Sequence, residues 1–261
     1  MKGRLGEWLG PVLTTVLFFA LWEVLCRMLK VPSFILPTPS ESMVALITQW
    51  STIWPNARHT LLTTSAGFLI SVAVGLMLGM LFGASNSVYR CVNPLLVAFN
   101  SIPKVAVVPV LVLWFGIGTV PAILTAFLLS FFPIVVNVAA GIATTEPELV
   151  DVLRSIGATR TDILIKVGLP RSLPYFFASL KVAITLAFVG AIMSETVASN
   201  EGVGYLMLAA SSSFQIPLVF ASLLLVAILG VAMYGIAVLV EQRFTSWASR
   251  TDTRKHPSIA V

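Results

Sequence analysis

Charged residues are scarce in this sequence. Only 10% of its 261 residues are Asp, Glu, Lys or Arg, whereas 57% are hydrophobic and the mean hydropathy is +0.97. This composition excludes an ordinary soluble domain, in which charged residues make up about a quarter of the chain. The apolar residues come in runs long enough to cross a bilayer, and runs such as residues 105–115 and 218–240 do not alternate as membrane β-strands do. The sequence therefore predicts an all-α, polytopic membrane protein.

Residues that often carry chemistry are also few. The chain has two cysteines and two histidines. Cys26 and Cys91 are predicted to lie near opposite ends of the membrane, so no disulfide between them is expected. His59 and His256 are interpreted as loop residues, and two histidines alone cannot make a metal site. The net charge of +5 comes from Lys and Arg beside apolar runs, so no nucleic-acid partner is expected.

Six apolar runs are predicted to span the membrane, with membrane lipid around them, as a single domain that covers residues 1–261. The predicted spans are residues 9–28, 60–84, 94–115, 121–142, 175–193 and 217–240. Arg27 and Lys30 follow the first run in place of a small-residue cleavage site, so this run is expected to stay in the protein. In the second run Gly75, Gly79 and Gly83 repeat every four residues, which predicts a close helix contact.

The distribution of Lys and Arg predicts the orientation of the spans. If both termini are cytoplasmic, eleven loop-side Lys and Arg fall inside and three fall outside. The inner residues are Lys2, Arg4, Arg90, Arg154, Arg160, Lys166, Arg171, Arg243, Arg250, Arg254 and Lys255. The outer residues are Arg27, Lys30 and Arg58. The segment between the fourth and fifth spans is therefore predicted to be cytoplasmic.

Polar residues within the spans are candidate pathway residues. Lys104 follows Pro103 in the third span, and a lysine inside a bilayer costs about 2.5 to 3.5 kcal/mol on insertion scales, so it is expected to face the protein interior or a water-filled cavity. Broken helices line substrate paths in transporters. We predict that Lys104 and Pro103 line a pathway together with Asn137, and that Lys104 attracts an anion. The alternative is a lysine that pairs with a neighbouring span or extends to the inner surface.

The longest charged segment comprises residues 144–174. Thr145 and Glu148 form a capping-box pattern, and an apolar residue recurs at helical spacing as far as Ile156. Gly157 is predicted to adopt the left-handed conformation that ends this helix. These features alone fit a solvated linker as well as a functional loop.

A second short helix is predicted to follow. Thr159 is placed to cap it, and an apolar stripe continues to Val167. Leu169-Pro170 and Leu173-Pro174 are expected to end this helix and to lead the chain into the fifth span.

The spacing in this segment carries a resemblance to a known family. The segment reads Asp151-Val152-Leu153, three residues, Gly157, nine residues, Val167, one residue, and then Leu169-Pro170. It resembles the Glu-Ala-Ala-x3-Gly-x9-Ile-x-Leu-Pro loop in the membrane subunit of bacterial type I binding-protein-dependent ABC importers. It departs from that pattern where Val152 and Leu153 replace two alanines.

Three further runs resemble one branch of these importers. Residues 102–106, 113–118 and 202–206 look like the nitrate, sulfonate and taurine branch, which also includes importers of pyrimidine precursors of thiamine. The resemblance implies a six-span permease that moves a small anion such as nitrate, a sulfonate or taurine. The alternative substrate is a pyrimidine thiamine precursor or another small organic solute.

The resemblance also implies partners. A dimeric cytoplasmic ATPase would bind ATP and Mg and drive the loop, a second copy of this chain would complete the pathway as a homodimer, and a periplasmic or lipid-anchored protein would deliver the substrate. The location would be the bacterial inner membrane. The expected ATPase-contact residues, counting the motif positions, are Asp151, Arg154, Gly157, Arg160, Asp162, Leu169 and Pro170. Glu195, before the Gly202-Val203-Gly204 turn, is expected to belong to an outer gate or a binding-protein surface, or to be an ordinary interfacial carboxylate.

Two other function classes fit the sequence less well. No Lys follows a Gly in the chain, so the GK of a P-loop is absent and no nucleotide cofactor is expected here. An intramembrane enzyme would need facing acid, base or nucleophilic groups, and the candidates Glu23, Lys104, Lys181 and Glu195 lie mostly near span ends. A channel would not need a loop with this motif. A permease rather than an enzyme is expected.

Overall fold

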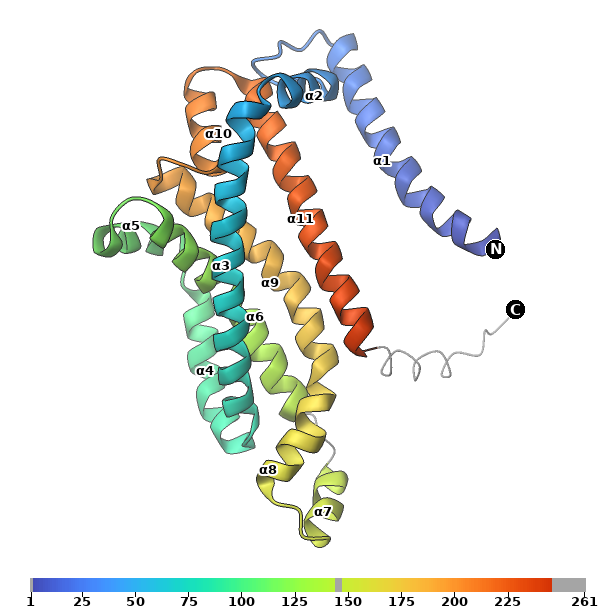
Figure 1. Cartoon of the computed structure of the whole chain (residues 1–261), viewed down its shortest axis with the longest axis vertical. Coiled ribbons are helices and arrows are strands. Elements are labelled where there is room, and N and C mark those ends of the chain that lie inside the picture. The colour runs from blue at the N-terminus through green and yellow to red at the C-terminus, as the bar shows by residue number, and fades with distance from the viewer. Residues whose placement is uncertain (1, 144–146, 246–261) are drawn as a thin grey trace.

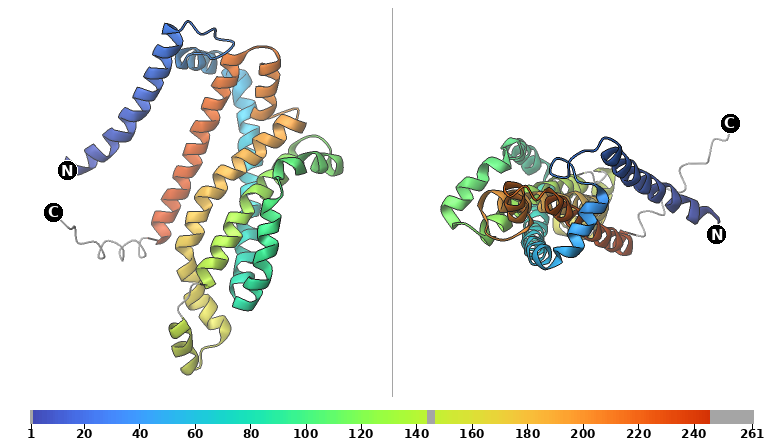
Figure 2. Two further views of the ribbon diagram at one scale, coloured as in Figure 1. Left: turned by 180° about the vertical axis from the view of Figure 1, so that it is seen from behind. Right: turned by 90° about the horizontal axis from the view of Figure 1, so that it is seen from above.

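The computed structural model describes residues 2–143 and 147–245, which form helices without any strand. In chain order the elements are α1 (Lys2–Met28), α2 (Pro39–Thr48), α3 (Trp50–Gly83), α4 (Asn86–Ser101), α5 (Lys104–Phe115), α6 (Thr119–Ala143), α7 (Pro147–Ser155), α8 (Arg160–Ile163), η1 (Leu164–Gly168), α9 (Leu169–Ala198), α10 (Val203–Ser212) and α11 (Ile216–Thr245). Figure 1 shows α2 and α10 at one end of the molecule and α7 and α8 at the other. In both side views α1 lies on one flank and α5 on the opposite flank (Figure 2).

Five helices are long and apolar enough to cross a membrane, and one bent pair makes a sixth candidate span. The five cover Gly10–Met28, Trp50–Gly83, Thr119–Ala143, Thr161–Ala198 and Ile216–Phe244. The bent pair is Ser87–Ser101 with Lys104–Phe115, and its two helices meet at 82°. The all-α, polytopic class predicted from composition is therefore confirmed.

The bend of this pair lies at Pro103. Ile102 is extended, with φ −69° and ψ 126°, as expected for a residue before proline. The helix that precedes the bend already starts at Asn86, so residues 86–93, before the predicted start of this span, are helical too. The irregularity expected for the third span is thus a sharp corner between two helices.

Small residues allow α3, α6 and α9 to pack closely. Gly75, Gly79 and Gly83 are buried on one face of α3, and a Cβ added at Gly79 would lie 2.6 Å from Cβ of Val138 on α6. On α9, a Cβ at Gly190 would lie 2.7 Å from the carbonyl oxygen of Thr125. The predicted close helix contact is confirmed, and it is made with α6.

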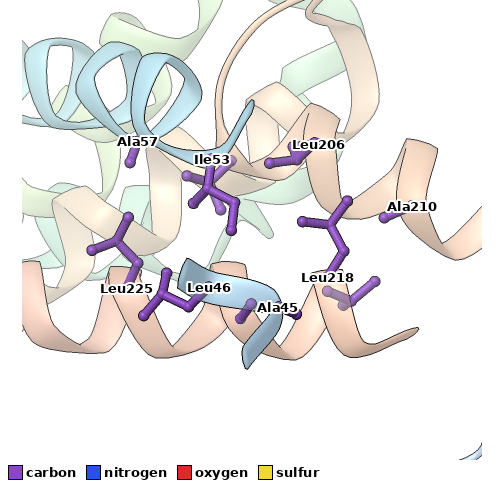
Figure 3. Packing of buried hydrophobic residues seen from close by; sticks show 11 residues of the cluster. Ala45, Leu46, Ile53, Ala57, Leu206, Ala210, Leu218 and Leu225 are labelled. Carbon is purple, nitrogen blue, oxygen red and sulfur yellow. The ribbon is translucent and has the colours of Figure 1, made fainter. Parts of the chain in front are cut away.

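A separate apolar cluster packs the end that carries α2 and α10. Leu46 of α2, Ile53 of α3, Leu206 of α10 and Leu225 of α11 belong to this cluster, and Figure 3 shows their side chains gathered between the four helices. The cluster fixes the short helix α10 against the start of α3. That contact brings together the polar residues around Glu195 that are described below.

Candidate functional site

The turn after α7 is organised by Gly157. Its φ is +88°, the left-handed conformation that the sequence predicts at this position. Gly157 N donates to the carbonyl of Arg154 at 3.0 Å, and Ala158 N donates to the carbonyl of Leu153 at 3.0 Å. Together these bonds make a Schellman motif, which satisfies carbonyls that the helix end would otherwise leave free.

The next helix begins with a reciprocal cap. The backbone N–H of Asp162 donates to the Thr159 hydroxyl oxygen at 3.1 Å, and the Thr159 N–H donates to the Asp162 carboxylate at 3.2 Å. Lys166 Nζ lies 2.8 Å from Asp162 Oδ1. The predicted cap at Thr159 is confirmed. Thr145, which the sequence places in the cap of the preceding helix, lies outside the described residues, as does the side chain of Arg160.

The two short helices leave an apolar surface uncovered at the end of the molecule. Val152 is 59% exposed and Ile156 is 75% exposed, so the apolar face predicted for α7 is not buried within this chain. A groove of about 330 Å³ lies beside them and is lined by Leu153, Gly157 and Lys166 among others. Asp151 and Arg154 lie on the same helix, with 3.7 Å between Oδ1 and Nη1. We call α7 and α8 with their connecting turn, residues 147–163, the coupling segment.

The expected helix stop at Leu169-Pro170 and Leu173-Pro174 is wrong. η1 is a π-helical turn that continues directly into α9, and Pro174 lies inside α9. Leu169 N donates to the carbonyl of Leu164, five residues back. Pro170 directly follows the π turn, and its missing N–H removes one backbone donor from the continuous helix without ending it. As a result Leu169 and Pro170 belong to the base of α9 rather than to the exposed groove.

Lys104 lies at the corner of the bent span. Its Nζ donates to the backbone oxygen and to the side-chain oxygen of Asn100, both at 2.6 Å. A pocket of about 120 Å³ adjoins it. The pocket is lined by Phe99, Asn100, Ile102, Lys104, Val107, Leu128, Phe131 and Phe132. The site therefore combines one cation and one amide with apolar and aromatic walls.

The other predicted pathway residues lie elsewhere. Pro103 is exposed at the corner itself, at the position just before the first residue of α5. The amide of Asn137 donates to the carbonyl of Pro133 at 2.8 Å on its own helix, and this residue does not line the Lys104 pocket. Glu195 also does not line it.

Glu195 lies near the C-terminal end of α9 and is buried, at 1% exposed. Thr60 donates its hydroxyl to Oε2 at 2.7 Å, and Thr63 donates to Oε1 at 3.2 Å. His59 Nδ1 lies 3.5 Å from Oε1. The carboxylate is therefore surrounded by polar groups of α3 rather than by water. An ordinary interfacial carboxylate, one of the three alternatives that the sequence leaves open for Glu195, would be exposed to water.

The interpretation of His59 as a loop residue is wrong. It lies within α3, which starts at Trp50, and its Nε2 is 3.1 Å from the hydroxyl of Thr119 and 3.6 Å from a carboxylate oxygen of Glu201. The sequence contains a usable signal, because His59, Thr60 and Thr63 share a helical face once residues 50–59 are taken as helix. We call Asn56, His59, Thr60, Thr63, Glu195 and the turn at 202–204 the Glu195 cluster.

These features define a class of protein. Five candidate membrane-spanning helices and a sixth bent pair, with a lysine at the corner of the bent pair, make this a polytopic helical membrane protein. Its described residues contain no group of three or more His, Cys, Asp or Glu that could hold a metal.

Comparison with known proteins identifies the family. Residues 71–246 match the family described as "Binding-protein-dependent transport system inner membrane component". The chain is 31% identical to the formylaminopyrimidine transport permease protein ThiX of Halalkalibacterium halodurans over 93% of this chain and 97% of that protein. It is 26% identical to the taurine transport system permease protein TauC of Escherichia coli, over 89% and 86% of the two chains. The chain therefore belongs to the binding-protein-dependent inner membrane component family.

A solved structure supports the fold. A chain of the inward-facing MetNI methionine ABC transporter aligns with a TM-score of 0.57 and 21% identity, over 78% of this chain and 97% of that one. This protein is thus a type I ABC importer permease of the sulfonate and taurine branch, and its ATPase is a separate partner. It is not an enzyme, as the sequence predicts, and the family excludes the channel alternative.

Proposed function

We propose that this permease moves a small anion such as nitrate, a sulfonate or taurine. Lys104 is the observation that carries the proposal. Its described partners are the two neutral oxygens of Asn100, so its positive charge is not cancelled by an ion pair within the described residues. An anion at this corner would gain a strong attraction, because Coulomb energies grow as the surroundings become less polar than water. The similarity to a taurine permease supports this class of substrate.

We further propose that the coupling segment is where a dimeric ABC ATPase acts. Its exposed apolar side chains, its fixed turn and its charged rim are what a protein interface needs. The proposed contact and motif residues are Asp151, Arg154, Gly157, Arg160, Asp162, Leu169 and Pro170. ATP and Mg would be bound by the ATPase, with no cofactor in this chain.

The proposed assembly is a homodimer of this chain in the bacterial inner membrane, with both termini cytoplasmic. The bias of eleven inner to three outer Lys and Arg supports the orientation. A periplasmic or lipid-anchored binding protein would then meet the end of the molecule that carries α10. Pro103 and Asn137 are proposed to shape the pathway, and Glu195 to belong to its outer end.

A second candidate substrate is a planar pyrimidine. Three phenylalanines line the Lys104 pocket, and Phe131 stacks on Phe127 with ring centroids 5.2 Å apart. Aromatic walls suit a planar ring better than a hydrated ion. The 31% identity to ThiX supports this candidate.

Variants of Lys104 test the anion proposal. Lys104→Ala and Lys104→Glu are expected to lower uptake of the anion by about tenfold or more, with the larger loss for Glu because it would repel the substrate. Uptake is measured in cells or vesicles at matched surface expression. Lys104→Arg keeps the charge and is expected to retain much of the activity. Unchanged transport by both the Ala and Glu variants would rule out the role of Lys104.

The assembly is tested by copurification. The tagged full-length chain is expected to bring down an ABC ATPase and a second copy of itself, and the binding protein encoded with it can then be assayed against nitrate, taurine, alkanesulfonates and aminopyrimidines. Binding of an aminopyrimidine alone would favour the second candidate. Recovery of the chain without an ATPase would contradict the proposed function.

A further inference from the structure

The first turn of α10 is held by side chains from other helices. Gly202 N donates to Asn56 Oδ1 at 2.9 Å, Val203 N donates to the Thr60 hydroxyl oxygen at 2.8 Å, and Gly204 N donates to Glu195 Oε2 at 3.2 Å. The first N–H groups of a helix have no partner within the helix, and a negative charge near them is favourable. The N–H groups of Gly202 and of the first two residues of α10 are thus satisfied by side chains of α3 and α9.

The close approach of this turn to Glu195 depends on its two glycines. Gly202 has a φ of +102°, and a Cβ placed on it would collide with the carboxyl group of Glu195. A Cβ on Gly204 would lie 2.8 Å from Cβ of Glu195 and would also collide with the carbonyl oxygen of Ile192. The two glycines therefore let the turn lie closer to Glu195 than residues with a Cβ could.

Glu195 stands on the same continuous helix as the coupling segment. α8, η1 and α9 follow one another without a break from Arg160 to Ala198. Asp162 and Glu195 are 33 residues apart, which corresponds to roughly 50 Å at the rise of an α-helix. Figure 1 shows this helical path running from the end with α7 and α8 to the end with α10.

We infer that Glu195, together with Thr60, is a positioning residue that joins α10 to this helical path, so that movement imposed on the coupling segment reaches α10 at the opposite end. Thr60 is central because its single hydroxyl donates to Glu195 and accepts from Val203. The inference rests on the proposed action of the ATPase at the coupling segment. In this inference the Glu195 cluster transmits that action and does not contact the substrate.

A matched pair of substitutions on α3 separates this role from ordinary packing. Thr60→Val removes the bridging hydroxyl at nearly constant volume. Thr64→Val makes the same change one turn further on, at a buried residue whose hydroxyl has no hydrogen-bond partner in the described part of the chain. Thr60→Ser keeps the hydroxyl and serves as the rescue variant.

The experiment measures hydrogen–deuterium exchange of residues 199–207 in the complex of the full chain with its copurified ATPase, before and after trapping with ATP and orthovanadate. In the wild-type complex, trapping is expected to change exchange at Gly202 to Gly204. Thr60→Val is expected to exchange about tenfold faster before trapping, because the N–H of Val203 loses its acceptor and Glu195 loses the hydroxyl that ties it to this N–H, and to lose the response to trapping. Thr60→Ser and Thr64→Val are expected to behave as wild type.

The outcomes distinguish this inference from the function on which it rests. A complex that hydrolyses ATP and is trapped by vanadate, but in which residues 199–207 do not respond, overturns the inference alone. So does a Thr60→Val complex that responds as the wild type does. If no ATPase copurifies with the wild-type chain, the proposed function is overturned and the inference with it.

Discussion

Replacing Gly157 with valine is expected to abolish transport while the permease still folds and reaches the membrane. The φ of Gly157 is +88°, a region that β-branched residues almost never occupy. No atom lies within 4 Å of an added Cβ, so the penalty comes from the backbone rather than from a collision. A left-handed conformation costs an ordinary residue roughly 1–2 kcal/mol, and more for valine. The turn is expected to relax, and the two hydrogen bonds that set α7 against α8 would be lost.

The measurement compares ATP hydrolysis and substrate uptake by the reconstituted complex. Gly157→Val is expected to lose stimulation of ATP hydrolysis by the loaded binding protein, together with uptake, at unchanged surface expression. Gly157→Asn is the control, since asparagine tolerates positive φ and is expected to keep most of the coupling. Normal stimulated hydrolysis in the valine variant would contradict the proposed role of the turn.

A large loss of stability is expected for Gly190→Ala. A Cβ at this position of α9 would lie 2.7 Å from the carbonyl oxygen of Thr125, 2.8 Å from Cα of Ala126 and 2.9 Å from its nitrogen. These are backbone atoms of α6, which cannot move aside as a flexible side chain can. The two helices must therefore separate along their contact, and overpacking of this kind costs roughly 1–3 kcal/mol.

Thermal unfolding of the detergent-solubilised permease, followed by size-exclusion chromatography, checks this expectation. Gly190→Ala is expected to lower the apparent melting temperature by several degrees and to reduce the yield of folded protein. Gly230→Ala and Gly235→Ala on α11 are matched controls, because no atom lies within 4 Å of a Cβ at either site. They are expected to change stability by less than about 1 kcal/mol. Equal melting temperatures for all three variants would contradict the close packing of α6 on α9.

Local rules were enough to predict several features. Gly157 ends its helix in a left-handed conformation because the residues before it form a short amphipathic helix and glycine has no steric penalty at positive φ. Thr159 caps the next helix because Asp162 stands three residues later. Both features depend on residues within a few positions of one another.

Other predictions failed because a helix continues through residues that locally favour a loop or a helix end. Pro170 and Pro174 read as helix breakers in sequence, yet the π turn at Leu164–Gly168 joins α8 to α9 and carries the helix past both. His59 reads as a loop residue because polar residues precede it, although α3 begins nine residues earlier. In each case a neighbouring helix supplies packing that outweighs the local propensity.

The sequence by itself determined that this chain is a helical membrane protein, that its charged segment lies between the fourth and fifth predicted spans, and that this segment turns at Gly157. Hydropathy, caps and motif spacing are local properties, and they can be read from neighbouring residues. Only the tertiary structure decided that Glu195, Thr60 and the turn at Gly202 to Gly204 form one site, since 135 residues separate Thr60 from Glu195. Only it showed that the helix carrying Glu195 continues to the coupling segment, because the burial of a carboxylate and the path of a helix past two prolines depend on which helices pack against them.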